Sequence, residues 1–150
     1  MKRPHLVLDT NILVSALVFG GPPREILNMI IAGAVNCSLS LPILDELQDV
    51  LQRPKFGFSP QQAMGIAEDL STLCAIVNPL EQISVIGADP DDDRILECAL
   101  EARARIIISG DAHLLDLRAY ESIRIMNPSE FLQMVRERTS TPKERQRRKR

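Results

Sequence analysis

The stretch Ile106-Ile107-Ile108-Ser109-Gly110-Asp111 decides the fold of this 150-residue chain. Three consecutive β-branched residues favour a strand, and the run is too short for a helix. Because all three are apolar, the strand is expected to be buried on both faces, as in the centre of a parallel sheet. Ser109 and Gly110 end this strand, so Asp111 is predicted to emerge at the carboxyl edge of the sheet.

The amino-terminal segment has the same arrangement, because the apolar run from His5 to Leu8 is followed directly by Asp9. Between and beyond these two strands, apolar residues at helical spacing alternate with short strand-like runs. Further strands are expected at 36–40, 75–77 and 123–126, and helices at 12–18, 24–32, 42–53, 60–74, from 91, from 114 and at 128–138. Gly20 to Pro23 is expected to separate the first two helices. The alternation predicts an α/β fold, a three-layer sandwich in which helices flank a central parallel sheet.

Composition indicates one globular domain with an aliphatic core, since the chain has no Trp, one Tyr and four Phe. So few aromatic rings argue against base stacking, so nucleic acid would bind through its phosphates. Three widely spaced cysteines in apolar stretches predict buried, reduced thiols and a cytoplasmic protein. No run approaches the roughly 20 apolar residues that cross a bilayer, and no export signal is recognised.

Charge divides the chain into two parts. Residues 1–135 carry ten basic and eighteen acidic residues, a net charge of −8, and residues 136–150 carry eight basic and two acidic, a net charge of +6. We therefore expect a domain over 1–135 and a basic, disordered tail over 136–150. The tail either attracts an acidic partner or only aids solubility.

Four acidic residues, Asp9, Glu46, Asp92 and Asp111, are predicted at strand ends or helix starts. Because parallel α/β folds bind ligands outside the carboxyl ends of their strands, these side chains are expected to meet there. Carboxylates without Cys or His favour Mg²⁺ or Mn²⁺ over zinc. Each acid alone could merely cap a helix, so the prediction depends on their joint occurrence.

Together these motifs resemble a PIN domain from His5 to about Val135, and most closely the toxins of bacterial toxin–antitoxin pairs, the VapC-like ribonucleases. The resemblance rests on four segments: Asp9-Thr10-Asn11, Leu41 to Leu47, Asp89 to Asp93, and Ser109-Gly110-Asp111 with Leu114-Leu115. It implies a metal-dependent endoribonuclease that binds RNA, leaves 5′-phosphate and 3′-hydroxyl ends, pairs with an antitoxin protein and forms a homodimer.

Site roles follow from the same resemblance. Asp9, Glu46, Asp92 and Asp111 match the catalytic metal ligands, and Asn11 and Ser109 match supporting polar residues. Asp93 is the alternative third acid, and the spacing of seven residues to Ala99 selects Asp92. Similarly, the apolar stripe of its helix selects Glu46 over Asp45.

Two other functions fit some of these features. A receiver-type signalling domain also gathers aspartates around Mg²⁺, but it needs a lysine at the end of its last strand, which is absent after 123–126. A non-catalytic PIN-like module would bind RNA or protein without cleaving it. Among other residues, His113 is expected to be a surface histidine, and Glu97, Glu101 and Arg105 a solvated helix face.

Overall fold

Six strands form one sheet in the computed structural model, which describes residues 3–83 and 90–139. The strand order is β3-β2-β1-β4-β6-β5, and every neighbouring pair is parallel except β5 and β6. Their bounds are β1 His5–Leu8, β2 Asn36–Ser40, β3 Ala75–Val77, β4 Ile106–Ile108, β5 Ala119–Tyr120 and β6 Ile123–Met126. β5 was not predicted, because a two-residue strand has no alternation pattern to recognise.

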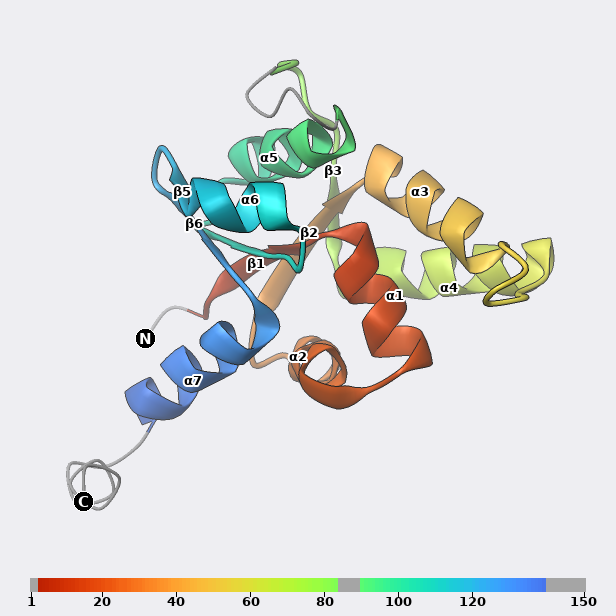
Figure 1. The fold of residues 1–150 in the computed structure, drawn as a ribbon, viewed down its shortest axis with the longest axis horizontal. Coiled ribbons are helices and arrows are strands. Elements are labelled where there is room, and N and C mark those ends of the chain that lie inside the picture. Colours follow the sequence, from red (N-terminus) through yellow and green to blue (C-terminus); the bar gives the residue numbers. More distant parts are fainter. Residues whose placement is uncertain (1–2, 84–89, 140–150) are drawn as a thin grey trace.

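Helices lie on both sides of this sheet (Figure 1). α5 lies across one face and contacts β1, β2 and β4, whereas α2 and α7 lie on the other side. The predicted three-layer α/β sandwich is therefore confirmed. The helices are α1 Thr10–Val18, α2 Gly21–Ile31, α3 Leu41–Leu51, α4 Pro60–Leu73, α5 Pro90–Ala102, α6 Ala112–Leu117 and α7 Pro128–Thr139.

Prolines begin several helices. Pro60 follows Ser59, whose hydroxyl accepts from the Gln62 backbone at 3.1 Å, while the Gln62 side chain accepts from the Ser59 backbone at 2.9 Å. This capping box fixes the start of α4. The prediction that Gly20 to Pro23 separates two helices was wrong in part, because α2 already begins at Gly21. Proline in a first turn costs no hydrogen bond, since the N–H groups there have no partner within the helix.

The core is aliphatic, as expected. Leu6, Leu39 and Ile107 are fully buried, and Phe131 is a fully buried aromatic residue beside them in the same cluster. All three cysteines are buried and free. Burial raises the pKa of the Cys98 thiol to about 12, so this thiol is protonated and unreactive at neutral pH.

Glu97 corrects the prediction of a solvated face on α5. Its side chain is 5% exposed, pairs with Arg94 at 2.9 Å and accepts a hydrogen bond from the Ile83 backbone at 2.8 Å. A buried carboxylate is tolerated because these partners satisfy it. Arg105 lies beyond the end of α5, so it does not belong to this helix face either.

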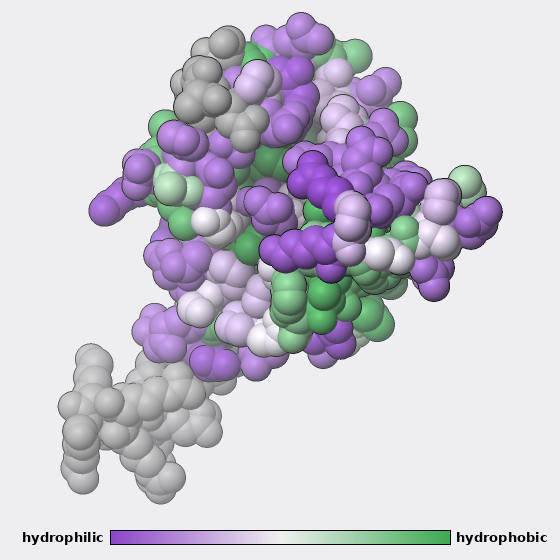
Figure 2. Space-filling model, turned by 45° about the vertical axis from the view of Figure 1, so that its right-hand side comes forward, coloured by the Kyte–Doolittle hydropathy of each residue, from purple (hydrophilic) through white to green (hydrophobic). Residues whose placement is uncertain are grey.

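The surface is mainly hydrophilic on the side that carries α3 and α4, with one hydrophobic area among polar side chains (Figure 2). Exposed apolar side chains include Phe19, Leu41 and Met64. Within the described ranges, no helix has the length and hydropathy needed to cross a bilayer. α7 continues to Thr139, past the predicted domain end at 135, and the rest of the predicted tail, 140–150, lies outside the described residues, so the domain boundary stays a prediction.

Candidate metal site at the carboxyl edge of the sheet

The candidate site lies at the carboxyl end of β1, at the point where the strand order of the sheet reverses. β1 pairs with β2 on one side and with β4 on the other, and the Asp9 backbone N–H donates to the Ile108 carbonyl at 3.1 Å. In parallel sheets, such a switch point leaves a crevice at the carboxyl ends of the strands. Asp9 and Ser109 both lie at this point, one residue beyond their strands.

Asp9 is buried, with 5% of its side chain exposed. Its Oδ1 caps α1 by accepting from the Ile12 backbone at 2.9 Å, and its Oδ2 accepts from the Ser109 hydroxyl. Burial raises the pKa of the Asp9 carboxyl above its ordinary value, and the Asp111 carboxylate raises it further, although hydrogen bonds from Ser109 and from the backbones of Ile12 and Gly110 lower it. The negative charge of Asp9 therefore destabilises the folded protein, and its hydrogen-bond donors compensate for this only in part.

Ser109 connects two of the predicted acids. It is fully buried, and while its hydroxyl donates to Asp9 its oxygen accepts from the Asp111 backbone at 2.9 Å. The Asp111 Oδ1 caps α6 by accepting from the backbones of His113 at 2.9 Å and Leu114 at 3.1 Å. Both acids are consequently held in fixed orientations at helix starts.

Glu46 is the predicted acid that α3 contributes to the site. The Thr10 hydroxyl donates to Glu46 Oε2 at 3.0 Å, so the residue after Asp9 orients the second acid. Asn11 is exposed and also lines the pocket described below. Asp45, the rejected neighbour of Glu46, is exposed and does not line this pocket.

The first turn of α5 supplies further carboxylates. Asp92 is 7% exposed and lines the pocket, as does the exposed Asp91. Asp93 is buried but is not part of the pocket lining, and Asp89 lies outside the described residues. Asp92 therefore lines the same pocket as the other predicted acids, whereas Asp93 is not among the described lining residues.

One small pocket of about 50 Å³ brings these groups together. Its lining residues come from the carboxyl end of β1, from α1, α3 and α5, and from the residue that caps α6. Among the described residues, its charged lining consists only of carboxylates, and Ile95 is the apolar residue among them. The described lining is Asp9, Thr10, Asn11, Glu46, Asp91, Asp92, Ile95 and Asp111.

The donor chemistry of this lining fits a hard divalent cation, which prefers carboxylate oxygens and retains water. Among the described residues, however, no three His, Cys, Asp or Glu side chains lie close enough together to hold a metal ion. The carboxylates line one pocket without converging on one point.

Two lining residues were not predicted as site residues. Thr10 was part of a motif but was given no role, and no local pattern reveals that its hydroxyl reaches Glu46, 36 residues away. Asp91 was also given no role in the site. His113 is exposed, as expected, and lies outside the pocket lining.

A family profile for the PIN domain matches residues 5–113, most of the chain. The chain therefore belongs to the PIN domain family, as its motifs indicated. This membership leaves the receiver-type alternative without support. No curated protein matches the chain in sequence.

Several solved structures share the fold. VapBC2 from Rickettsia felis, bound to a DNA fragment from its promoter, is 15% identical with a TM-score of 0.58, covering 82% of this chain and 98% of that one. VapBC-1 from nontypeable Haemophilus influenzae is 18% identical with a TM-score of 0.57, covering 83% and 98%. DNA-bound VapBC from Salmonella typhimurium is 16% identical with a TM-score of 0.56, also covering 83% and 98%.

Proposed function

We propose that this chain is a metal-dependent endoribonuclease, the toxin of a toxin–antitoxin pair. The observation that carries the proposal is the meeting of Asp9, Glu46, Asp92 and Asp111, from four separate segments, around one pocket. Membership of the PIN domain family supports the same function.

Asp9, Glu46, Asp92 and Asp111 are the residues that would hold Mg²⁺ or Mn²⁺. A bound divalent cation would neutralise the carboxylates, polarise the scissile phosphate and lower the pKa of a coordinated water. The raised pKa of Asp9 supports this assignment, because a nearby cation would compensate the buried charge that the protein alone does not.

The remaining lining residues orient the acids and the substrate. Ser109 and Thr10 fix the carboxylates of Asp9 and Glu46 by donating hydrogen bonds to them. Such supporting hydrogen bonds typically keep metal-binding side chains in place. Asn11, which is exposed and lines the pocket, would donate its amide N–H to a phosphate oxygen.

Water is the nucleophile in this proposal. In the part of the chain that the structure describes, the pocket lining contains no Ser, Cys, Lys or His, and the hydroxyl of Thr10 already donates to Glu46. A water oxygen forms the new bond to phosphorus while the bond to the 3′ oxygen breaks, and the leaving oxygen takes up a proton. The products carry 5′-phosphate and 3′-hydroxyl ends, in agreement with the PIN resemblance.

Cleavage of a labelled single-stranded RNA in Mg²⁺ or Mn²⁺, with EDTA as the metal-free reference, tests the proposal. Asp9→Asn is expected to reduce the cleavage rate by on the order of a hundredfold or more, because it removes a metal-binding charge. The fold should survive, since asparagine caps helices as well as aspartate does.

A matched pair of variants sharpens this test. Glu46→Gln is expected to lose activity to a similar degree, whereas Asp45→Asn, one residue away on the exposed side of α3, is expected to retain it. Full activity of Asp9→Asn and Glu46→Gln would disprove the nuclease site. If the wild type binds RNA but never cleaves it with any divalent cation, the chain is a non-catalytic PIN-like binding module.

We also infer an antitoxin partner, a homodimer and a cytoplasmic location. The structural relatives are named as VapBC complexes, which supports a partner protein for this chain as well. Three buried free thiols suit a reducing compartment. Co-purification with a small protein encoded beside this chain, and suppression of RNA cleavage by it, would support the pairing, whereas activity that is unaffected by that protein would contradict it.

A further inference from the structure

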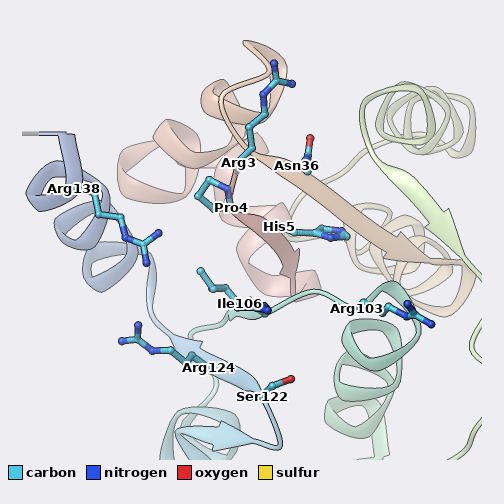
Figure 3. A pocket seen from close by; sticks show the side chains of 10 residues that line it. Arg3, Pro4, His5, Asn36, Arg103, Ile106, Ser122, Arg124 and Arg138 are labelled. Carbon is cyan, nitrogen blue, oxygen red and sulfur yellow. The ribbon is translucent and has the colours of Figure 1, made fainter. Parts of the chain in front are cut away.

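A hollow of about 900 Å³ opens at the amino-terminal edge of the sheet, opposite the acid pocket. The residues that line it precede or begin β1, β2, β4 and β6, or lie at the end of α7 (Figure 3). We call it the arginine hollow, because its described lining includes Arg3, Arg103, Arg105, Arg124 and Arg138.

Positive charge is concentrated there. Residues 1–135 contain only ten basic residues, and four of them line this one hollow. None of its described lining residues is acidic, and none of its five arginines pairs with a carboxylate of residues 3–83 or 90–139. Like charges gathered without counter-charges repel each other, which favours an anionic ligand between them.

The chemistry of the lining selects phosphate as the ligand group. Arginine presents a planar fork of N–H donors that matches phosphate oxygens, and the five cationic residues of the described lining are all arginines. A folded protein or peptide partner would need apolar anchors, but Pro4 and Ile106 are the main apolar groups of the described lining. No Phe, Tyr or Trp is present there to stack on a base.

We propose that the arginine hollow binds the phosphate backbone of single-stranded RNA. That the nucleic acid is RNA rests on the proposed function, whereas the hollow itself is independent of the acid pocket. The two sites lie at opposite ends of the strands, and β1 alone spans about 13 Å between them. Residues 1–135 carry a net charge of −8, so most of the domain repels RNA, and the hollow supplies the attraction that the acid pocket lacks.

Binding of a fluorescein-labelled single-stranded RNA to the full chain, followed by fluorescence anisotropy over a range of salt concentrations, tests this site. EDTA is present throughout, so that cleavage does not interfere. The test variant is Arg105→Gln with Arg124→Gln, since both side chains are exposed and their loss should not alter thermal unfolding. The control is Arg53→Gln with Lys55→Gln, which removes two exposed charges outside the hollow.

The test variant is expected to bind RNA about tenfold more weakly than the wild type, and the slope of log affinity against log salt should fall by about 1.4. The control variant should keep the wild-type slope. Unchanged binding by the test variant, or an equal loss in both variants, would overturn the proposal.

Two further measurements identify the ligand and separate the two proposals. If polyglutamate binds the wild type as tightly as RNA and weakens equally in the test variant, the occupant is an acidic protein and the RNA assignment is wrong. Salt-sensitive binding in EDTA, together with no cleavage in Mg²⁺ or Mn²⁺, would refute the nuclease and leave the arginine hollow standing.

Discussion

Asp9 is the residue in which local structure and the proposed chemistry meet. One carboxylate oxygen caps α1 and the other accepts from Ser109, although the side chain is 5% exposed. A neutral asparagine would serve the cap equally well. The negative charge therefore costs stability at this position, and a bound cation is the partner that would compensate it.

Asp9→Asn is expected to stabilise the metal-free protein at neutral pH. The pKa of Asp9 is raised in the folded state from an ordinary value of 3.8. The stabilisation associated with the protonated carboxyl is complete below that value and is lost as the pH rises through the folded pKa. Asparagine stays neutral at every pH, so the variant does not lose this stabilisation. Its free energy of unfolding should therefore exceed that of the wild type only above about pH 4.

Urea unfolding in EDTA at pH 3.5 and at pH 7 measures this difference, if the protein remains folded at the lower pH. Asp45→Asn is the control, because a substitution on the exposed surface changes the free energy of unfolding by less than about 0.5 kcal/mol. A variant that is less stable than the wild type at pH 7 would show that the Asp9 charge is already fully compensated within the protein.

Helix starts differ in what their caps do. Asp9 and Asp111 cap α1 and α6 and also line the acid pocket, whereas Ser59 caps α4 at a distance from it. Aspartate and serine cap helices about equally well, so capping alone does not require charge. Carboxylate caps at the pocket and a hydroxyl cap elsewhere support a second role for the two acids.

Ser59→Ala is expected to lower the free energy of unfolding by about 1 kcal/mol, because it breaks the capping box of α4. RNA cleavage should be unchanged. Ser71→Ala in the same helix is the matched control: the Ser71 hydroxyl only donates to the Ala67 carbonyl, and removing such a bond from a helix interior costs little. Equal losses in the two variants would exclude a specific role for the cap.

The sequence predicted the elements whose signals are local. Ile106 to Ile108 is a run of β-branched residues, and Ser59 with Pro60 marks a helix start, so both were placed correctly. The start of α2 was missed because glycine and proline suit a first turn as well as a break. The burial of Glu97 was missed because it depends on Arg94 and on the backbone of Ile83.

For the candidate site, motifs in the sequence selected the four acids, but they did not predict the hydrogen bonds that orient those acids. The Thr10 hydroxyl reaches Glu46 because α3 packs against α1, and the Ser109 hydroxyl reaches Asp9 because β4 pairs with β1. The arginine hollow was also not predicted, because its arginines are scattered along the sequence and only the parallel sheet gathers them at one edge.

At the scale of the whole molecule, the sheet separates two sites of opposite charge. Asp9 and Asp111 follow the carboxyl ends of the parallel strands β1 and β4, whereas Arg3 and Arg105 precede the amino ends of the same strands. A chain with a net charge of only −2 thereby presents a carboxylate pocket for a cation and an arginine-lined hollow for an anion. Attraction and catalysis are thus assigned to different edges of one domain.

X-ray anomalous scattering from crystals of the protein soaked in Mn²⁺ tests the metal site most directly. We expect a manganese peak among the carboxylates of Asp9, Glu46, Asp92 and Asp111, and its loss in crystals of Asp9→Asn. Manganese bound elsewhere on the protein, with none beside these four carboxylates at saturating concentration, would contradict the proposed site.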